Sequence, residues 1–335
     1  MKLLLFTLFS SAAALPRPLF NETVICAGSN CLKPDMKYER ISASQPGYQW
    51  DDAGGYCGSW AIQRATLAKG AYISQQQVRD HTSPGGGHDN EILSTNIDEA
   101  YKNLKIEAEG FDYNSTPVPQ QNAYFKWLKK HLVAGNTVTW MIMWNGQNYP
   151  IYGLKPPAGL YGHVEPVIGI QSNHPLTDET VYDDDVAVHF TDGGINTVYK
   201  TISTLPGDWA GPGKPGICRD GNYCIGPYSF GWAVKGFLDQ QKGAVPASLS
   251  IEPWLKEPDL RSGEKPIPLA GTLTATGLAA GSAYDIYRWD SVEDAFTYQD
   301  SFKKSSFTAS NSSFVYKDPI PFSSNSTTYY RCVAH

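Results

Sequence analysis

The chain has 335 residues, of which 41% are hydrophobic and 18% are charged, and its formal net charge is -6. This composition is typical of a globular protein with a sizeable core, not of a disordered chain, and the length predicts about two domains. The 27 lysines and arginines are scattered and form no basic stripe, which argues against a nucleic-acid partner.

The first residues have the pattern of a secretory signal peptide. Residues 1–14 join Lys2 to an apolar run and end in three alanines, which are typical of a cleavage site. No later apolar run approaches the ~20 residues that span a bilayer, so we expect no membrane span and a location outside the cell or in the lumen of the secretory pathway or vacuole. Four glycosylation triplets agree with this route. They begin at Asn21, Asn114, Asn311 and Asn325.

Six cysteines in an exported chain favour disulfide bonds. Two pairs are close enough in sequence to close short loops: Cys26 with Cys31, and Cys218 with Cys224. A bond between the remaining two, Cys57 and Cys332, would need the C-terminus to reach the main domain. A free Cys57 is the simpler interpretation, although it leaves Cys332 unpaired.

A glycine-rich stretch leads to Cys57, and the residues that follow predict a helix. Apolar side chains recur at three- and four-residue spacing from Trp60 to Ala68, and Gly70 supplies the stop. Cys57 would then lie at a helix N-terminus, where unpaired N–H groups and the helix dipole favour the reactive thiolate. We therefore take Cys57 as the candidate nucleophile. The alternative is a purely structural exoprotein in which Cys57 is oxidised to a disulfide.

Helices are predicted to precede strands in the first domain. Periodic apolar residues predict helices over residues 73–80, 91–104 and 122–133, the first of them capped by Ser74. Runs rich in β-branched and aromatic residues predict strands over residues 137–144, 164–170 and 186–190, and residues 230–238 close the domain.

The composition changes near residues 242–246. Short β-prone runs separated by Gly, Ser, Asn and Pro follow, and they predict a small β-sandwich of immunoglobulin or fibronectin type III character over residues 246–335. Catalytic side chains do not gather in this stretch. We therefore expect a stabilising or binding appendage to a main domain over residues 15–243.

Cysteine catalysis needs a thiolate, an imidazole that takes and returns its proton, and a polar group that orients the imidazole. His163 begins one predicted strand, and Asp192 follows another that would pair with it through the intervening hairpin. Asp192 would then lie beside His163 and orient it. The alternative is that Asp192 only shapes a turn with the two glycines that follow it.

Two further groups of polar residues are weaker candidates for function. Asp183, Asp184 and Asp185 lack the glycine and terminal glutamate of a calcium loop, so a solvated turn is predicted and no metal or cofactor is expected. His189 should face the side of its strand opposite to its neighbours, where a structural role is expected.

Several of these stretches, in this order, resemble the papain-like cysteine peptidases. They are Cys-Gly-Ser-Trp-Ala at 57–61, the helix start at 73–78, the helix-to-strand stretch at 125–143 and Gly-His-Val-Glu-Pro-Val-Ile-Gly at 162–169. The resemblance covers roughly residues 45–238. Within that superfamily the chain is similar to the branch of bacteriocin-leader peptidases, in which glycine directly follows the cysteine and the strand after the histidine strand ends in aspartate.

The resemblance implies an α+β fold, with a helical subdomain and an antiparallel β subdomain, and a thioester intermediate on peptide or protein substrates. It also implies that Gln49 helps to form the oxyanion hole, with Gln45 as the second candidate. In papain itself the nucleophile directly precedes a tryptophan, and alignment on Trp60 would place Ser59 there. Under that alignment the chain is a catalytically inactive binding protein. An acyl or peptidyl transferase on the same fold is the other alternative.

Overall fold

The computed structural model describes residues 32–50, 56–82, 92, 96–113, 115–117, 120–145, 160–190, 197–205, 224–225, 231–253, 257–258, 260 and 263–335. Several predicted positions lie outside the described residues: the signal segment 1–14, Asn21, Cys26, Cys31, Asn114, Asp192 and Cys218. The side chain of Cys224 is also outside them, so neither predicted disulfide falls within the described part. Of the glycosylation positions that are described, Asn311 is exposed and Asn325 is half-buried.

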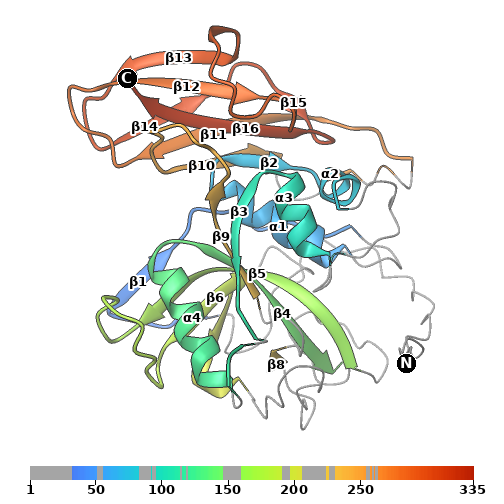
Figure 1. Cartoon of the computed structure of the whole chain (residues 1–335), viewed down its shortest axis with the longest axis vertical. Coiled ribbons are helices and arrows are strands. Elements are labelled where there is room, and N and C mark those ends of the chain that lie inside the picture. Colours follow the sequence, from blue (N-terminus) through green and yellow to red (C-terminus); the bar gives the residue numbers. More distant parts are fainter. Residues whose placement is uncertain are drawn as a thin grey trace.

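An eight-stranded sheet forms the centre of the N-terminal part (Figure 1). Its order is β3-β9-β4-β5-β6-β7, with β1 beside β5 and β8 beside β4. The strands are β1 (Tyr38–Ile41), β3 (Ile106–Gly110), β4 (Thr137–Asn145), β5 (Leu160–Ser172), β6 (Val186–Phe190), β7 (Thr197–Thr201), β8 (Cys224–Ile225) and β9 (Gly231–Phe237). Their pairing is antiparallel throughout the described residues.

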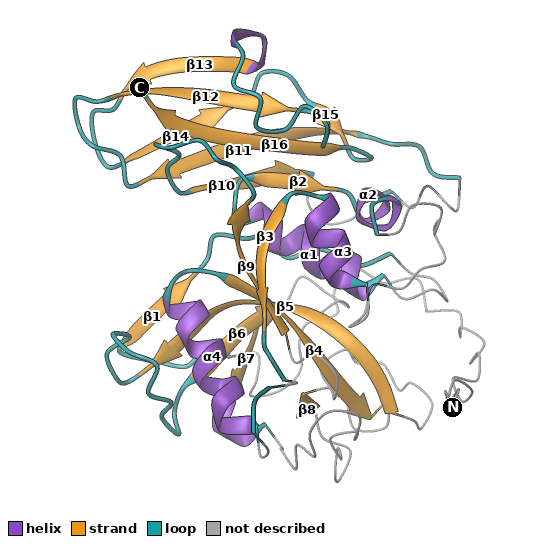
Figure 2. Ribbon diagram, viewed as in Figure 1, coloured by secondary structure: helices purple, strands orange, loops and turns teal. Residues whose placement is uncertain are grey.

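Helices lie on both sides of this sheet (Figure 2). They are α1 (Cys57–Leu67), α2 (Gln75–Asp80), α3 (Ile97–Asn103) and α4 (Gln121–Val133), with 3-10 turns at Ile202–Thr204 and Asp300–Phe302. The helix N-cap predicted at Ser74 is present, since its hydroxyl accepts a hydrogen bond from the backbone N–H of Gln77. Gly70 and Gly135 follow α1 and α4 with φ of +86° and +78°, a backbone conformation that favours glycine. Helices combined with antiparallel sheets confirm the predicted α+β class.

The described residues include no helix long and apolar enough to cross a membrane.

The strand β5 is buried on both faces, and the two faces meet different helices. On one face Val167 joins a hydrophobic cluster with Trp140 of β4 and with side chains of α4. On the other face Val164 and Ile168 join a cluster with the first residues of α1. Successive side chains of a strand point to opposite faces, so each residue of β5 belongs either to the α4 side or to the α1 side.

The C-terminal part consists of two packed sheets. One has the order β10-β11-β14 with β15 beside β11, and the other has the order β13-β12-β16-β2. The strands are β10 (Ala247–Glu252), β11 (Pro268–Thr276), β12 (Ala283–Trp289), β13 (Lys303–Thr308), β14 (Ser313–Lys317), β15 (Phe322–Ser323) and β16 (Thr327–Ala334). The boundary predicted between residues 243 and 246 falls between β9 and β10.

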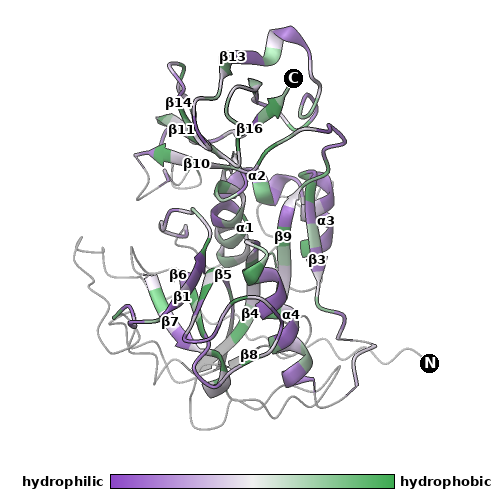
Figure 3. Ribbon diagram, turned by 90° about the vertical axis from the view of Figure 1, so that its left-hand side faces the viewer, coloured by the Kyte–Doolittle hydropathy of each residue, from purple (hydrophilic) through white to green (hydrophobic). Residues whose placement is uncertain are grey.

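A strand from before that boundary completes the second sheet. β2 (Ala71–Ile73) follows α1 directly and pairs with β16, with Tyr72 opposite Thr328. Leu67 and Tyr72 also belong to the hydrophobic cluster between the two C-terminal sheets. In the side view of Figure 3, α1 lies between β16 above and β5 below. The two parts of the chain therefore share hydrophobic core.

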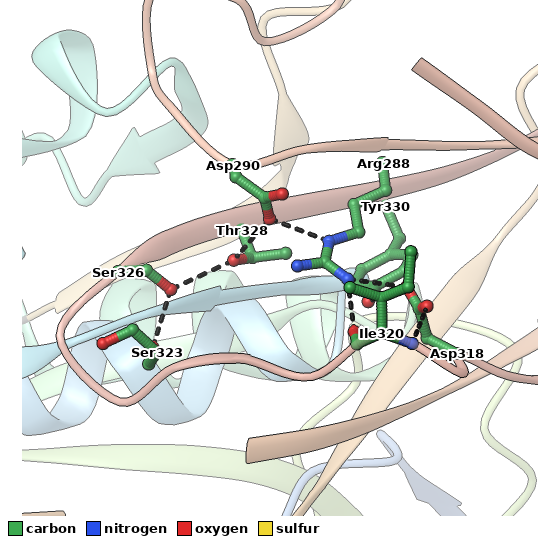
Figure 4. A network of polar contacts seen from close by, with 8 residues as sticks. All are labelled: Arg288, Asp290, Asp318, Ile320, Ser323, Ser326, Thr328 and Tyr330. Atoms are coloured by element: carbon green, nitrogen blue, oxygen red, sulfur yellow. Dashed lines mark hydrogen bonds and ion pairs between the residues drawn. The ribbon is translucent and has the colours of Figure 1, made fainter. Parts of the chain in front are cut away.

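A buried arginine holds the loop that leads into β16 (Figure 4). Arg288 of β12 donates to Asp318 Oδ2 at 3.0 Å and to Asp290 Oδ1 at 2.8 Å. The hydroxyl of Tyr330 donates to the same oxygen of Asp318 at 2.6 Å. Because Asp290 in turn accepts from Thr328 at 3.1 Å, the network joins β12, the loop and β16 close to the strand pair with β2.

Candidate functional site

Cys57 is the first residue of α1, as the sequence predicts for its candidate nucleophile. Its side chain is buried, with 6% of the residue exposed, and it is a free thiol. Cys332 is also free, so the two cysteines are not joined to each other. Burial raises the pKa of the Cys332 thiol to about 12, which makes this second cysteine a poor nucleophile.

The first turn of α1 is tightly packed. A Cβ atom at Gly58 would lie 2.1 Å from the backbone oxygen of Ile92, so a larger residue does not fit there. The guanidinium carbon of Arg79 lies 3.9 Å from the ring centre of Tyr56, and its Nε donates to Ser59 Oγ at 3.3 Å. The residues on either side of Cys57 are therefore held by contacts from elsewhere in the chain.

Gln49, the predicted oxyanion-hole residue, lies in a segment that runs past the start of α1. The neighbouring Trp50 packs its ring against Tyr56, with the ring centres 5.2 Å apart. Within the described part of the chain, Oε1 of Gln49 is buried and has no hydrogen-bond partner. Gln45 is instead bound to β10: its Nε2 donates to the carbonyl of Ile251 at 3.3 Å, and its Oε1 accepts from that residue's N–H at 2.7 Å.

His163 lies in β5 beside a carboxylate that the sequence analysis did not single out. Its Nε2 is 3.7 Å from Oε1 of Glu165, and Oε2 of Glu165 is 2.9 Å from Nδ1 of His189. The indole N–H of Trp140 donates to the same Oε2 at 3.4 Å. The Glu165 side chain is fully buried. The sequence could have identified Glu165 as a neighbour of His163 through their spacing of two residues, because residues i and i+2 share one face of a strand.

The positions of Glu165 and Val164 decide which way His163 points. His163 and Glu165 share the face of β5 that carries Val167 and Trp140, on the α4 side. Cys57 belongs to the cluster with Val164, on the α1 side. Among the described residues, the structure therefore brings His163 together with Glu165 and His189 and directs it away from Cys57.

His189 and Asp185, two further predicted polar positions, lie in the described part of the chain and have structural partners. β6 pairs with β5, with His189 opposite Val167, which is the pairing that the prediction for Asp192 requires. Asp185 is fully buried and paired with Nζ of Lys129 at 2.8 Å, so this part of the acidic turn is not solvated. The described residues contain no group of three or more His, Cys, Asp or Glu side chains that could hold a metal ion.

No protein-family profile matches the chain, and no curated protein matches it. Among solved structures, a weak neighbour is the clostridial cysteine protease Cwp84 after propeptide cleavage, in a variant in which one cysteine is replaced by alanine. The similarity has a TM-score of 0.25 at 11% sequence identity and covers 87% of this chain and 84% of that chain. A likeness at this level supports no inference about the mechanism of this chain.

Proposed function

We propose that the chain is an exported thiol hydrolase of the peptidase type, with Cys57 as its nucleophile. The observation that carries the proposal is a free cysteine at the first position of an eleven-residue helix. The N–H groups of a first helical turn have no intrahelical partner, and together with the helix dipole they stabilise a thiolate. They also stabilise an oxyanion that forms beside the sulfur.

In the proposed reaction the thiolate of Cys57 attacks the carbonyl carbon of a peptide. The C–N bond then breaks, the amine leaves with a proton from an imidazolium, and a thioester remains. Water then attacks the thioester while the imidazole takes its proton, the C–S bond breaks, the carboxylic acid product leaves, and the thiolate of Cys57 and the imidazolium are regenerated. His163, on the strand against which α1 packs, is the proposed proton carrier, and this role requires its imidazole to leave Glu165 on the α4 side and reach the α1 side of β5. Asp192 is its proposed orienting group, and the amide of Gln49 is the proposed side-chain donor to the oxyanion.

A specific observation favours a second candidate, a non-catalytic binding protein that keeps this scaffold. The imidazole of His163 is on the α4 side of β5, whereas Cys57 is on the α1 side. A thiol without an imidazole in reach lacks the proton transfer that thioester formation and breakdown require. Under this candidate the Glu165 cluster only stabilises the sheet.

The rate of alkylation of Cys57 by iodoacetamide, measured from pH 5 to pH 9 by peptide mass spectrometry, separates the two. The hydrolase predicts rapid labelling at mildly acidic pH that slows in His163→Ala. The matched control is His189→Ala, which removes the other imidazole beside Glu165 and should leave the rate nearly unchanged. Buried Cys332 serves as the internal reference for an unreactive thiol.

Superimposable profiles for wild type and His163→Ala would instead support the binding protein. Asp192→Asn belongs in the same series, since an orienting carboxylate shifts the profile and a turn residue does not. Cleavage of a peptide mixture that is abolished in Cys57→Ser would complete the case for hydrolysis.

A further inference from the structure

We propose that Gln75 is a positioning residue of the Cys57 site and that the C-terminal part of the chain acts on this site through Glu257. The inference rests on the proposed function, because it concerns the residues around Gln49. Gln75 is the first residue of α2 and does not contact the thiol; it acts through the backbone on both sides of Gln49.

The amide of Gln75 binds the chain on both sides of Gln49. Its Nε2 donates to the carbonyl of Tyr48 at 3.0 Å, and its Oε1 accepts from the N–H of Trp50 at 2.9 Å. Only one orientation of the amide satisfies both bonds, since Tyr48 offers an acceptor and Trp50 a donor. Gln75 is fully buried, so water does not compete for these groups. The backbone direction at Gln49 is therefore fixed by one side chain.

Two further bonds hold the preceding residues along α1. The indole N–H of Trp60 donates to the carbonyl of Gly47 at 2.9 Å, and Nη1 of Arg64 donates to that of Pro46 at 2.9 Å. At the other end, Trp50 packs on Tyr56, the residue before Cys57. The segment 46–50 is thus fastened along its length, with Gln49 near the start of α1. An oxyanion donor needs this rigidity, because preorganised groups stabilise a transition state without a reorganisation cost.

Glu257, in the segment that follows β10, joins this arrangement to the C-terminal part. Its Oε2 accepts from Nε2 of Gln63 in α1 at 2.7 Å, and its Oε1 accepts from the backbone N–H of Gln75 at 3.2 Å. One carboxylate therefore ties α1 to the start of α2, where Gln75 lies. Burial raises the pKa of Glu257 to about 7, against the hydrogen bonds from Gln63 and Gln75. The experiment is accordingly run at pH 8, where the carboxylate is ionised.

Two probes of Cys57 separate positioning from simple thiol reactivity. Iodoacetamide reacts with the thiolate without forming an oxyanion. A peptide aldehyde adds the sulfur to its carbonyl carbon, and the resulting hemithioacetal oxygen uses the oxyanion donors. The probes are iodoacetamide and a panel of N-acetylated dipeptide aldehydes with glycine, leucine or lysine at the last position. The variants are Gln75→Ala, the isosteric Gln75→Glu and Glu257→Gln. Gln77→Ala, at a half-buried position of the same helix, is the matched control.

We expect Gln75→Ala and Gln75→Glu to weaken aldehyde binding by about 10- to 100-fold, the range for a displaced catalytic group, with iodoacetamide rates within about twofold of wild type. Glu257→Gln should give a smaller loss in the same direction, and Gln77→Ala none. Equal losses with both probes, or unchanged aldehyde binding in both Gln75 variants, would overturn the inference. A wild type that reacts with iodoacetamide and binds no aldehyde would also overturn it. A Cys57 that does not react with iodoacetamide refutes the proposed function itself.

Discussion

Replacement of Tyr72 tests whether the two parts of the chain unfold as one unit. Tyr72 is 1% exposed, its hydroxyl donates to the carbonyl of Ser324 at 2.7 Å, and its ring centre lies 5.3 Å from that of Phe322. Tyr72→Phe removes one hydrogen bond and leaves a buried carbonyl unsatisfied, which costs about 1–3 kcal/mol. Tyr72→Ala also removes a buried ring, and the expected loss of unfolding free energy rises to about 3–5 kcal/mol.

The measurement is urea unfolding at equilibrium, followed by tryptophan fluorescence and by far-ultraviolet circular dichroism. Because β2 and β16 pair and share a hydrophobic cluster, both signals should move together to lower urea in each variant. Tyr316→Phe, at a half-buried tyrosine of β14, should stay within about 0.5 kcal/mol of wild type. Two separated transitions in Tyr72→Ala, with only one of them displaced, would refute a shared core.

Two further outcomes follow from single contacts. Gly58→Ala should lower the urea midpoint by the equivalent of about 1–3 kcal/mol, because the added methyl group would overlap the backbone oxygen of Ile92. An unchanged midpoint would contradict the tight packing described for the first turn of α1. Burial acts to raise the pKa of Asp285, but hydrogen bonds from Ser306 and Lys303 outweigh it and lower the pKa from 3.8 to about 2. The ionised carboxylate therefore stabilises the fold above about pH 4, and this contribution is lost as the pH falls through 2. Asp285→Asn should cost about 2 kcal/mol at pH 6 and little near pH 2, and a pH-independent loss would contradict the assignment.

The sequence determined much of the local structure. The helix that begins at Cys57, the N-cap at Ser74 and the helix predicted over 122–133 appear where their patterns place them. Three of the predicted strands correspond to β4, β5 and β6. These features depend on apolar periodicity, capping side chains and β-branched runs, which act over a few residues and can be read from the chain alone.

Tertiary structure alone decided how these elements meet. β5 is buried on both faces, so no solvent-exposed side of the strand indicates which residues face α1 and which face α4. That choice puts His163 with Glu165 and not with Cys57. Likewise β2 and β16 are paired although more than two hundred residues separate them. The edge strand of a sheet can hydrogen-bond to any strand whose side chains fill the neighbouring core, so the sequence near β2 does not identify its partner. The position of Cys57 at a helix start is local information, whereas the imidazole that would serve it depends on packing between distant segments.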